Sequence, residues 1–260
     1  MSYSAILYEK KGNVAVITLN QPKSMNSLVQ AIYDDLYAAA VEIEADDTVK
    51  AVVITGAGKA FCAGGDLKRF QEGFDHKSAY EYVEAVHPVC AKLVNLTKPT
   101  IAAVNGPAVG AGLSVMLMCD LSIAAEPAKM GSAYINMALI PDLTAAYFLP
   151  RVVGLRRAKE LCMTGRAISA AEALEIGLVN KVVPADQLME EALKLAEQIA
   201  EKSPLAIRHT KRLLNASPDL DFQSLLTLES YVEDVCFISE DSKEAVRAFM
   251  EKRKPVFKGR

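Results

Sequence analysis

Short runs of apolar residues alternate with longer amphipathic stretches over the first three quarters of the chain. The apolar runs are rich in β-branched residues and end at Gly, Asn or Pro, so they predict buried strands over 14–19, 51–55, 100–104 and 121–125. A capping-box pattern from Ser27 to Gln30 predicts a helix that runs to about Glu44, and residues 112–118 predict a short apolar helix. Strands that alternate with helices favour an α/β fold with largely parallel pairing.

The last quarter of the chain carries helical patterns only. Its signals are, in order, a capping box at 169–172 with Gly177 as the stop, an amphipathic stretch over 186–202, a Ser203-Pro204 helix start, and helical patterns near 222–237 and 240–252. We therefore expect two regions, a mixed core over residues 1–200 and a helical C-terminal region over residues 201–260.

Composition and charge exclude several classes of function. The chain has 260 residues, with 29 Lys and Arg against 32 Asp and Glu, so it has no overall positive field to bind nucleic acid or an anionic membrane. The N-terminal stretch does not have the pattern of a secretory signal. The long uncharged stretch over 99–119 contains Asn, Gly and Pro in its middle, which predicts strand, turn and helix rather than a membrane span.

Cysteine and histidine usage points to a cytoplasmic protein without a metal site. The five cysteines are scattered and form no C-x-x-C pair, which indicates reduced thiols. The three histidines do not have the spacing of metal ligands, so we expect no metal.

Two glycine-containing segments, 59–67 and 105–114, are the best candidates for a binding site. Each follows a predicted buried strand, and small residues there let a ligand approach the backbone. Two such turns side by side can direct two main-chain N–H groups at one oxygen, as in an oxyanion hole. For either segment alone, the simpler interpretation is that the glycines only make turns. Neither segment has the spacing of a P-loop or of a dinucleotide-binding loop.

The order and spacing of these and other motifs resemble the crotonase superfamily, the enoyl-CoA hydratases and isomerases. The motifs are Gln21–Leu28, the two glycine segments, Ile140-Pro141-Asp142, Leu149–Gly154, Leu161–Gly165 and Ile168–Ala170, and the resemblance covers nearly the whole chain. It implies a spiral of ββα units, a C-terminal helical trimerisation region and a homo-oligomer, a trimer or a dimer of trimers. It also implies an acyl-CoA substrate and no cofactor other than the coenzyme A that the substrate carries.

The resemblance assigns the oxyanion-hole amides to Gly65 and Ala111. Similar hydratases carry two glutamates where this chain has Ser114 and Tyr134. Adding water across a double bond requires an activated water and a proton donor, and a serine and a tyrosine are poor substitutes for two carboxylates. The sequence therefore argues against an ordinary hydratase.

One acid, Asp142, remains at a useful position, directly after Pro141, where certain enoyl-CoA isomerases carry aspartate. An isomerase can work with one carboxylate, which takes a proton from C2 of a 3-enoyl thioester and returns it at C4. Burial among apolar neighbours would raise the pKa of Asp142 toward a useful value. The alternative interpretation is that Asp142 caps a helix that starts near Leu143. The resemblance favours catalysis, and the two roles are compatible.

The remaining predicted site residues are expected to contact substrate rather than to react. The predicted substrate-binding residues are Lys23, Met25, Ala63, Asp66, Leu67, Ser114 and Tyr134, and the predicted coenzyme A contacts from a neighbouring subunit are Lys254, Phe257 and Lys258. Asp66 is also expected to order its loop or begin the next helix, and Cys62 to be a small packing residue.

We therefore expect an enoyl-CoA isomerase. The alternatives are a hydratase of the same superfamily and a catalytically silent protein that binds acyl-CoA. The pattern over residues 70–82 predicts no definite structure, and the length of the acyl chain does not follow from the sequence.

Overall fold

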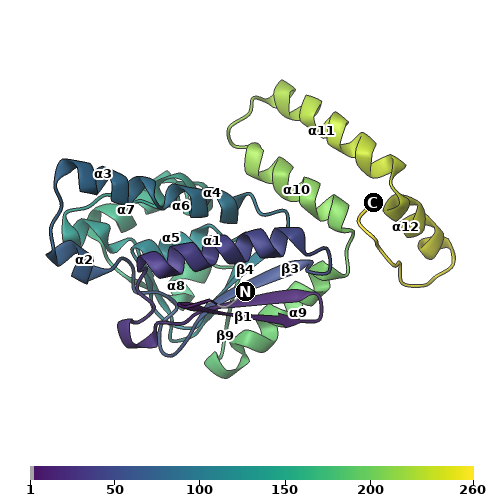
Figure 1. The fold of residues 1–260 in the computed structure, drawn as a ribbon. Coiled ribbons are helices and arrows are strands. Elements are labelled where there is room, and N and C mark those ends of the chain that lie inside the picture. Colours follow the sequence, from purple (N-terminus) through teal and green to yellow (C-terminus); the bar gives the residue numbers. More distant parts are fainter. Residues whose placement is uncertain (1–2) are drawn as a thin grey trace.

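The computed structural model describes residues 3–260 and is built around a six-stranded sheet (Figure 1). The strands lie in the order β1 (Ile6–Lys11), β2 (Val14–Leu19), β3 (Ala51–Gly56), β4 (Thr100–Val104), β6 (Leu121–Ala125) and β9 (Lys181–Val183). Only β1 is antiparallel to its neighbour. The four predicted strands are the four central ones. The two edge strands lack a long apolar run, because β1 is largely exposed and β9 is short.

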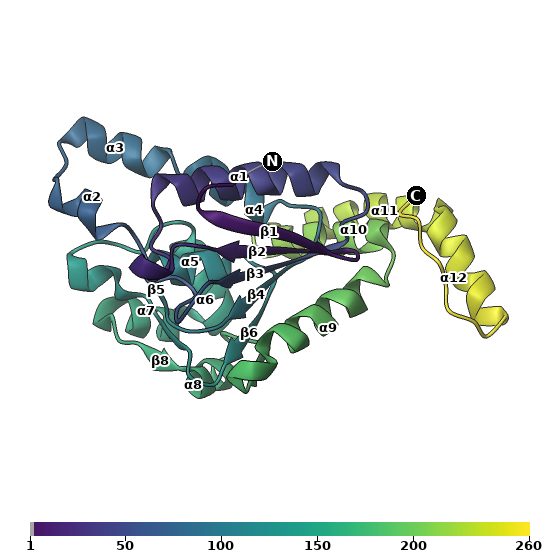
Figure 2. The same cartoon turned by 60° about the horizontal axis from the view of Figure 1, so that its bottom comes forward.

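Alternate residues of the central strands face two hydrophobic clusters. Val16 and Val53 belong to the smaller cluster, which includes the apolar residues of α9 (Leu188–Ala200). Ile17 and Ile54 belong to the larger cluster, together with residues of α1 (Gln30–Ala45) and α4 (His87–Val94). Figure 2 shows α1 and α9 on opposite faces of the sheet. Because both faces are covered, the central strands are largely apolar and do not alternate regularly with polar residues.

The helix expected from the capping box at Ser27 begins two residues later than predicted. α1 starts at Gln30, its N-cap is Val29, and no side chain caps it. The reason is a tertiary contact: the Leu28 N–H donates to the Gly64 carbonyl at 2.8 Å, so the segment before α1 pairs with the first glycine segment. This contact also holds the start of α1 beside the candidate site.

A second, three-stranded sheet lies in the order β5 (Ala108–Val109), β7 (Lys129–Gly131) and β8 (Ile168–Ser169). The uncharged stretch over 99–119 contains β4, β5 and α5 (Ala111–Leu117), which confirms the predicted strand, turn and helix. All residues of α5 are buried. Across residues 3–260, no helix combines the length and the apolar character that crossing a membrane would require.

The remaining elements of the core are short helices. They are α2 (Leu67–Gln71), α3 (His76–Glu84), α6 (Ala145–Val153), α7 (Leu155–Thr164), α8 (Ala170–Glu175), and the 3-10 helices η1 (Pro22–Ser24), η2 (Ala133–Met137) and η3 (Ala185–Gln187). The predicted cap at Ser169 is confirmed, because its hydroxyl accepts a hydrogen bond from the Glu172 N–H at 3.1 Å.

Three C-terminal helices extend away from the sheet (Figure 1): α10 (Pro204–Ala216), α11 (Phe222–Ile238) and α12 (Glu240–Met250). Their positions agree with the predicted helical patterns, and Ser203 caps α10 as expected. Large apolar side chains remain exposed on them, including Phe222 at 76%, Tyr231 at 72% and Phe249 at 82%. A trimerisation role for this region and a domain boundary near residue 200 stay predictions.

The C-terminal tail folds back onto α12. Asp241, which is buried, accepts hydrogen bonds from the N–H groups of Lys258 at 2.7 Å and Gly259 at 2.9 Å. Glu244 binds the Arg253 guanidinium at 2.6 Å. The predicted contact of Lys254, Phe257 and Lys258 with a neighbouring subunit's coenzyme A stays a prediction, and the tail that carries them is held in a definite position.

Candidate active site

The two glycine segments lie side by side and are joined by main-chain hydrogen bonds. The Cys62 N–H donates to the Pro107 carbonyl, and the Val109 N–H donates to the Cys62 carbonyl, both at 3.0 Å. The approach is so close that a Cβ on Gly112 would lie 2.0 Å from the Cys62 carbonyl oxygen. Glycine at position 112 is therefore required by contact between the two segments, and not only by a turn.

This pairing places the Gly65 and Ala111 amides at one end of the joined segments. Ala111 is the first residue of α5, so its N–H has no acceptor within the helix. Within the described part of the chain, neither the Gly65 N–H nor the Ala111 N–H donates to any acceptor. Both residues line one cavity of about 460 Å³. Two unused N–H groups beside a cavity are what an oxyanion hole requires.

The walls of this cavity are mostly apolar and come from residues far apart in the sequence. Among the predicted site residues, those that line it are Met25, Ala63, Gly65, Asp66, Leu67, Ala111, Tyr134 and Asp142. Lys23 is exposed and lies outside the lining. Ser114 is fully buried and also lies outside it, so the expectation that Ser114 lines the acyl pocket is wrong.

Asp142 faces the cavity with an unpaired carboxyl oxygen. Its Oδ1 is buried and has no hydrogen-bond partner within residues 3–260. Burial raises the pKa of Asp142, and the nearby Tyr134 hydroxyl acts in the opposite direction. The interpretation of Asp142 as a helix cap is wrong, because α6 begins at Ala145 with Thr144 at the N-cap and no side-chain cap. The main-chain carbonyl of Asp142, not its carboxylate, accepts the hydrogen bond from the Ala145 N–H at 2.9 Å.

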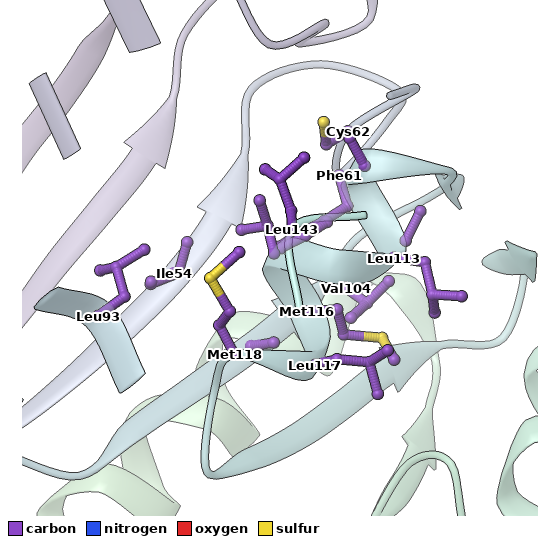
Figure 3. Close-up of a cluster of buried hydrophobic side chains, with 14 of the residues drawn as sticks. Ile54, Phe61, Cys62, Leu93, Val104, Leu113, Met116, Leu117, Met118 and Leu143 are labelled. Atoms are coloured by element: carbon purple, nitrogen blue, oxygen red, sulfur yellow. The ribbon is translucent and has the colours of Figure 1, made fainter. Parts of the chain in front are cut away.

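Leu143, the next residue, anchors this segment in the hydrophobic core. Figure 3 shows Leu143 in the buried cluster with Phe61 and Met116, next to α5. Leu143 and Thr144 have φ angles of 45° and 72°, which are unfavourable for residues with a Cβ. Core packing therefore maintains an unfavourable backbone conformation directly beside the carboxylate.

Ser114 and Tyr134 are hydrogen bonded to each other behind the cavity wall. The two hydroxyl oxygens are 2.7 Å apart, and the Ser114 hydroxyl donates to the main-chain carbonyl of Asp142 at 3.0 Å. Burial is the main cause that raises the pKa of Tyr134 above its ordinary value, and the Asp142 charge adds to it. Tyr134 is therefore a neutral hydroxyl at neutral pH.

Aromatic residues of the segment over 70–82, for which the sequence predicted no structure, form one wall of the cavity. Phe70 and Tyr82 line it, and their ring centroids are 6.0 Å apart; Phe74 packs against both. α3 in this segment starts with a capping box, in which Asp75 accepts from the Ser78 N–H and Ser78 reaches back to the Asp75 N–H. The spacing of Asp75 and Ser78 is present in the sequence, but Ser78 replaces the Glu or Gln of the usual capping box, so the signal for the start of α3 was missed.

Asp66 and Cys62, both in the first glycine segment, have the structural roles expected of them. Asp66 caps α2 by accepting a hydrogen bond from the Lys68 N–H at 3.1 Å. Cys62 is fully buried, and burial raises the pKa of its thiol to about 12, so the thiolate needed for nucleophilic chemistry is scarce.

A larger cavity of about 680 Å³ lies between α4, α6 and α10, with Arg208 and Arg212 in its lining. Within residues 3–260, its lining contains no carboxylate and neither of the Gly65 and Ala111 amides, so the smaller cavity is the candidate active site. In residues 3–260, no group of His, Cys, Asp and Glu side chains is arranged to hold a metal ion.

Comparisons with known proteins point to one family. Residues 9–260 match the family described as enoyl-CoA hydratase/isomerase. The chain is 41% identical to a protein of Rhizobium meliloti named as a probable enoyl-CoA hydratase, over all of both chains. It is 38% identical to a short-chain-enoyl-CoA hydratase of Clostridium acetobutylicum, and the match covers 98% of this chain and 97% of that protein.

The solved structures lead to the same fold. An enoyl-CoA hydratase from Bacillus anthracis superposes with a TM-score of 0.95 at 37% sequence identity, over 99% of this chain and all of the other. The α/β fold that the resemblance implied is thereby confirmed.

Proposed function

This chain belongs to the enoyl-CoA hydratase/isomerase family, and on that premise we propose that it moves the double bond of an enoyl-CoA thioester, with Asp142 as both base and acid. The observation that carries the proposal is the composition of the cavity. Its lining contains two carboxylates, Asp66 and Asp142, and Asp66 is occupied as the cap of α2. One free carboxylate suffices to move a proton between two carbons of the same substrate.

The first step forms an enolate. The thioester carbonyl oxygen accepts hydrogen bonds from the Gly65 and Ala111 N–H groups, and Asp142 removes a proton from C2 of a 3-enoyl thioester. The electron pair of that C–H bond moves into the C2–C1 bond, and the negative charge on the oxygen is held by the two amides. Removing one such donor costs about 10²–10³ in rate in other enzymes, so the pair is the main electrostatic contribution we expect.

The second step returns the proton. The enolate electrons re-form the carbonyl, the double bond moves from C3–C4 to C2–C3, and C4 takes the proton from Asp142. The carboxyl group is thus restored to its starting form within one turnover. A raised pKa suits this cycle, because a group that must both take and return a proton works best when its pKa is near the working pH.

Hydration is the second candidate, and the names of the relatives favour it over isomerisation. The relatives cited above are named as hydratases. In that reaction Asp142 would activate a water for attack at C3, and C2 would need a proton from the same carboxyl. The absence of a second free carboxylate in the lining within residues 3–260 is why the geometry favours isomerisation.

The two reactions are separated by supplying 3-enoyl-CoA and 2-enoyl-CoA in parallel and following the products by liquid chromatography, which separates the double-bond isomers, with detection by mass spectrometry. Isomerisation leaves the mass unchanged and hydration adds one water. We expect isomerisation to be faster, and an equal or faster hydration rate would refute the assignment of reaction type. Asp142→Asn should lower kcat by about 10²–10⁴, the usual contribution of a general base. Asp47→Asn, at an exposed position, is the matched control.

A catalytically silent protein would give a different result in the same experiment. It would bind an acyl-CoA without turning over either substrate, so binding is measured alongside by isothermal titration with a non-reactive acyl-CoA. Binding without turnover by the unmodified protein would refute both candidate reactions.

A further inference from the structure

Ser114 and Tyr134 connect the two halves of the candidate site. Ser114 lies on α5, the helix whose first residue, Ala111, supplies one of the two amides. Its hydroxyl donates to the main-chain carbonyl of Asp142 at 3.0 Å, and the Tyr134 hydroxyl lies 2.7 Å from it. Tyr134 comes from η2 and lines the cavity next to Asp142. A single hydrogen-bonded chain therefore links the helix of the oxyanion amide to the acid.

The hydrogen bonds of Ser114 and Tyr134 support a backbone segment whose conformation is unfavourable on its own. Leu143 and Thr144, directly after Asp142, both have positive φ angles, and Ala138 shortly before it has a φ of 56°. Three non-glycine residues with positive φ make this backbone unfavourable on its own, and it persists only when surrounding contacts hold it. The hydrogen bond from Ser114 is one such contact, made from a helix that is entirely buried.

The number of hydrogens in the pair fixes the direction of its hydrogen bonds. The Asp142 carbonyl can only accept, so Ser114 gives its one hydrogen to that carbonyl and the Tyr134 O–H is the donor to Ser114. The Asp142 carbonyl therefore has two partners, the Ser114 hydroxyl at 3.0 Å and the Ala145 N–H at 2.9 Å. Tyr134 orients the Ser114 hydroxyl toward the segment that carries the acid.

We propose that Ser114 and Tyr134 are positioning residues, a hydroxyl relay in which Tyr134 orients Ser114 and Ser114 fixes the main chain of Asp142 relative to the Ala111 amide. The inference rests on the proposed function, in which Asp142 acts on a thioester whose oxygen that amide holds. Neither residue needs to touch the reacting carbons.

The relay should be visible in the pH dependence of the rate. The other titratable groups that face Asp142 are Tyr33 from α1, Tyr82 from α3 and Cys90 from α4. Burial raises the pKa of each, that of Cys90 to about 11, so none of the three ionises near neutral pH. The Tyr134 hydroxyl beside the carboxyl group favours its ionised form and so lowers the pKa of Asp142.

The test uses Ser114→Ala, Tyr134→Phe and the double variant, measured by isomerisation of 3-enoyl-CoA across a pH series. We expect each single variant to lower kcat by about tenfold or more, since a misplacement of 1 Å can cost about 100-fold, with KM changed less than about twofold. Tyr134→Phe should in addition move the acidic limb of the kcat profile to higher pH, because activity requires the ionised carboxylate. The double variant should lower kcat by less than the product of the two single effects, because both substitutions break the same relay.

Matched controls remove a hydrogen-bonded hydroxyl elsewhere. Ser122→Ala removes a buried hydroxyl that donates to the Leu178 carbonyl at 3.3 Å, and Tyr3→Phe removes one that donates to Glu42 at 2.8 Å. Both should keep the kcat and the pH profile of the unmodified protein. Tyr134→Phe keeps the ring that fills the core, so the test remains decisive if Ser114→Ala does not fold.

The outcomes separate this inference from the proposed function. If Asp142→Asn abolishes activity while Tyr134→Phe and Ser114→Ala retain kcat and an unshifted pH profile, the relay is refuted and the role of Asp142 stands. If Asp142→Asn retains full activity, the proposed function fails, and the relay fails with it. Additive losses in the double variant would also overturn the relay, since they would show two independent contributions.

Discussion

Gly112→Ala tests the oxyanion hole through the contact that aligns its two amides. The added Cβ would lie 2.0 Å from the Cys62 carbonyl oxygen, whereas ordinary contact begins at 3.4 Å, so the two glycine segments must separate by more than about 1 Å. Gly65 and Ala111 lie on opposite sides of this contact, so their N–H groups would no longer point at one oxygen. We expect kcat to fall by about 10²–10³, as for the loss of one donor. Overpacking should lower the free energy of unfolding by about 1–3 kcal/mol.

The assay for Gly112→Ala pairs steady-state isomerisation of 3-enoyl-CoA with unfolding in denaturant. Gly177→Ala is the control, since its Cβ would meet nothing within 4 Å but its φ of 77° still disfavours alanine. It should cost about 1 kcal/mol of stability and leave kcat unchanged. A folded Gly112→Ala protein with kcat within about threefold of the unmodified enzyme would show that these two amides do not hold the oxygen.

Two further predictions concern the buried acid and the exposed C-terminal helices. Burial raises the pKa of Asp142 in the folded protein, so the unmodified protein loses stability as the pH rises from the ordinary carboxyl pKa through the raised one. Asn cannot ionise, so Asp142→Asn should melt at a higher temperature than the unmodified protein above about pH 5, and at about the same temperature near pH 3. A difference that stays constant with pH would contradict this. Because Phe222, Tyr231 and Phe249 are exposed, light scattering at micromolar concentration should find a particle several times 28.1 kDa; a fully active monomer would contradict that.

The central strands could be predicted because buried strands are rich in apolar residues. β2, β3, β4 and β6 are covered on both faces, so each is a largely apolar run, and a turn follows it. The helices α8 and α10 to α12 could be predicted for a related reason, since their caps and amphipathic spacing are local. The start of α1 could not, because the hydrogen bond from Leu28 to Gly64 competes with the local cap at Ser27.

The candidate site divides in the same way. The glycine segments, Asp142, and the substitution of Ser114 and Tyr134 for carboxylates are visible in the sequence, because they depend on which residue stands at which position. Whether Asp142 caps a helix or faces a cavity is not visible there. The answer depends on α6 beginning at Ala145, after two residues with positive φ.

The sequence by itself thus determined the α/β class, the family to which the chain is similar and the main candidate residues. Only the tertiary structure decided that Gly65 and Ala111 share one cavity with Asp142, and that Ser114 lies behind that cavity, bonded to Tyr134. The physical reason is the distance along the sequence between the residues that interact. Strand and cap signals come from neighbouring residues, whereas the site is assembled from contacts between segments tens of residues apart, and no local pattern records their distances.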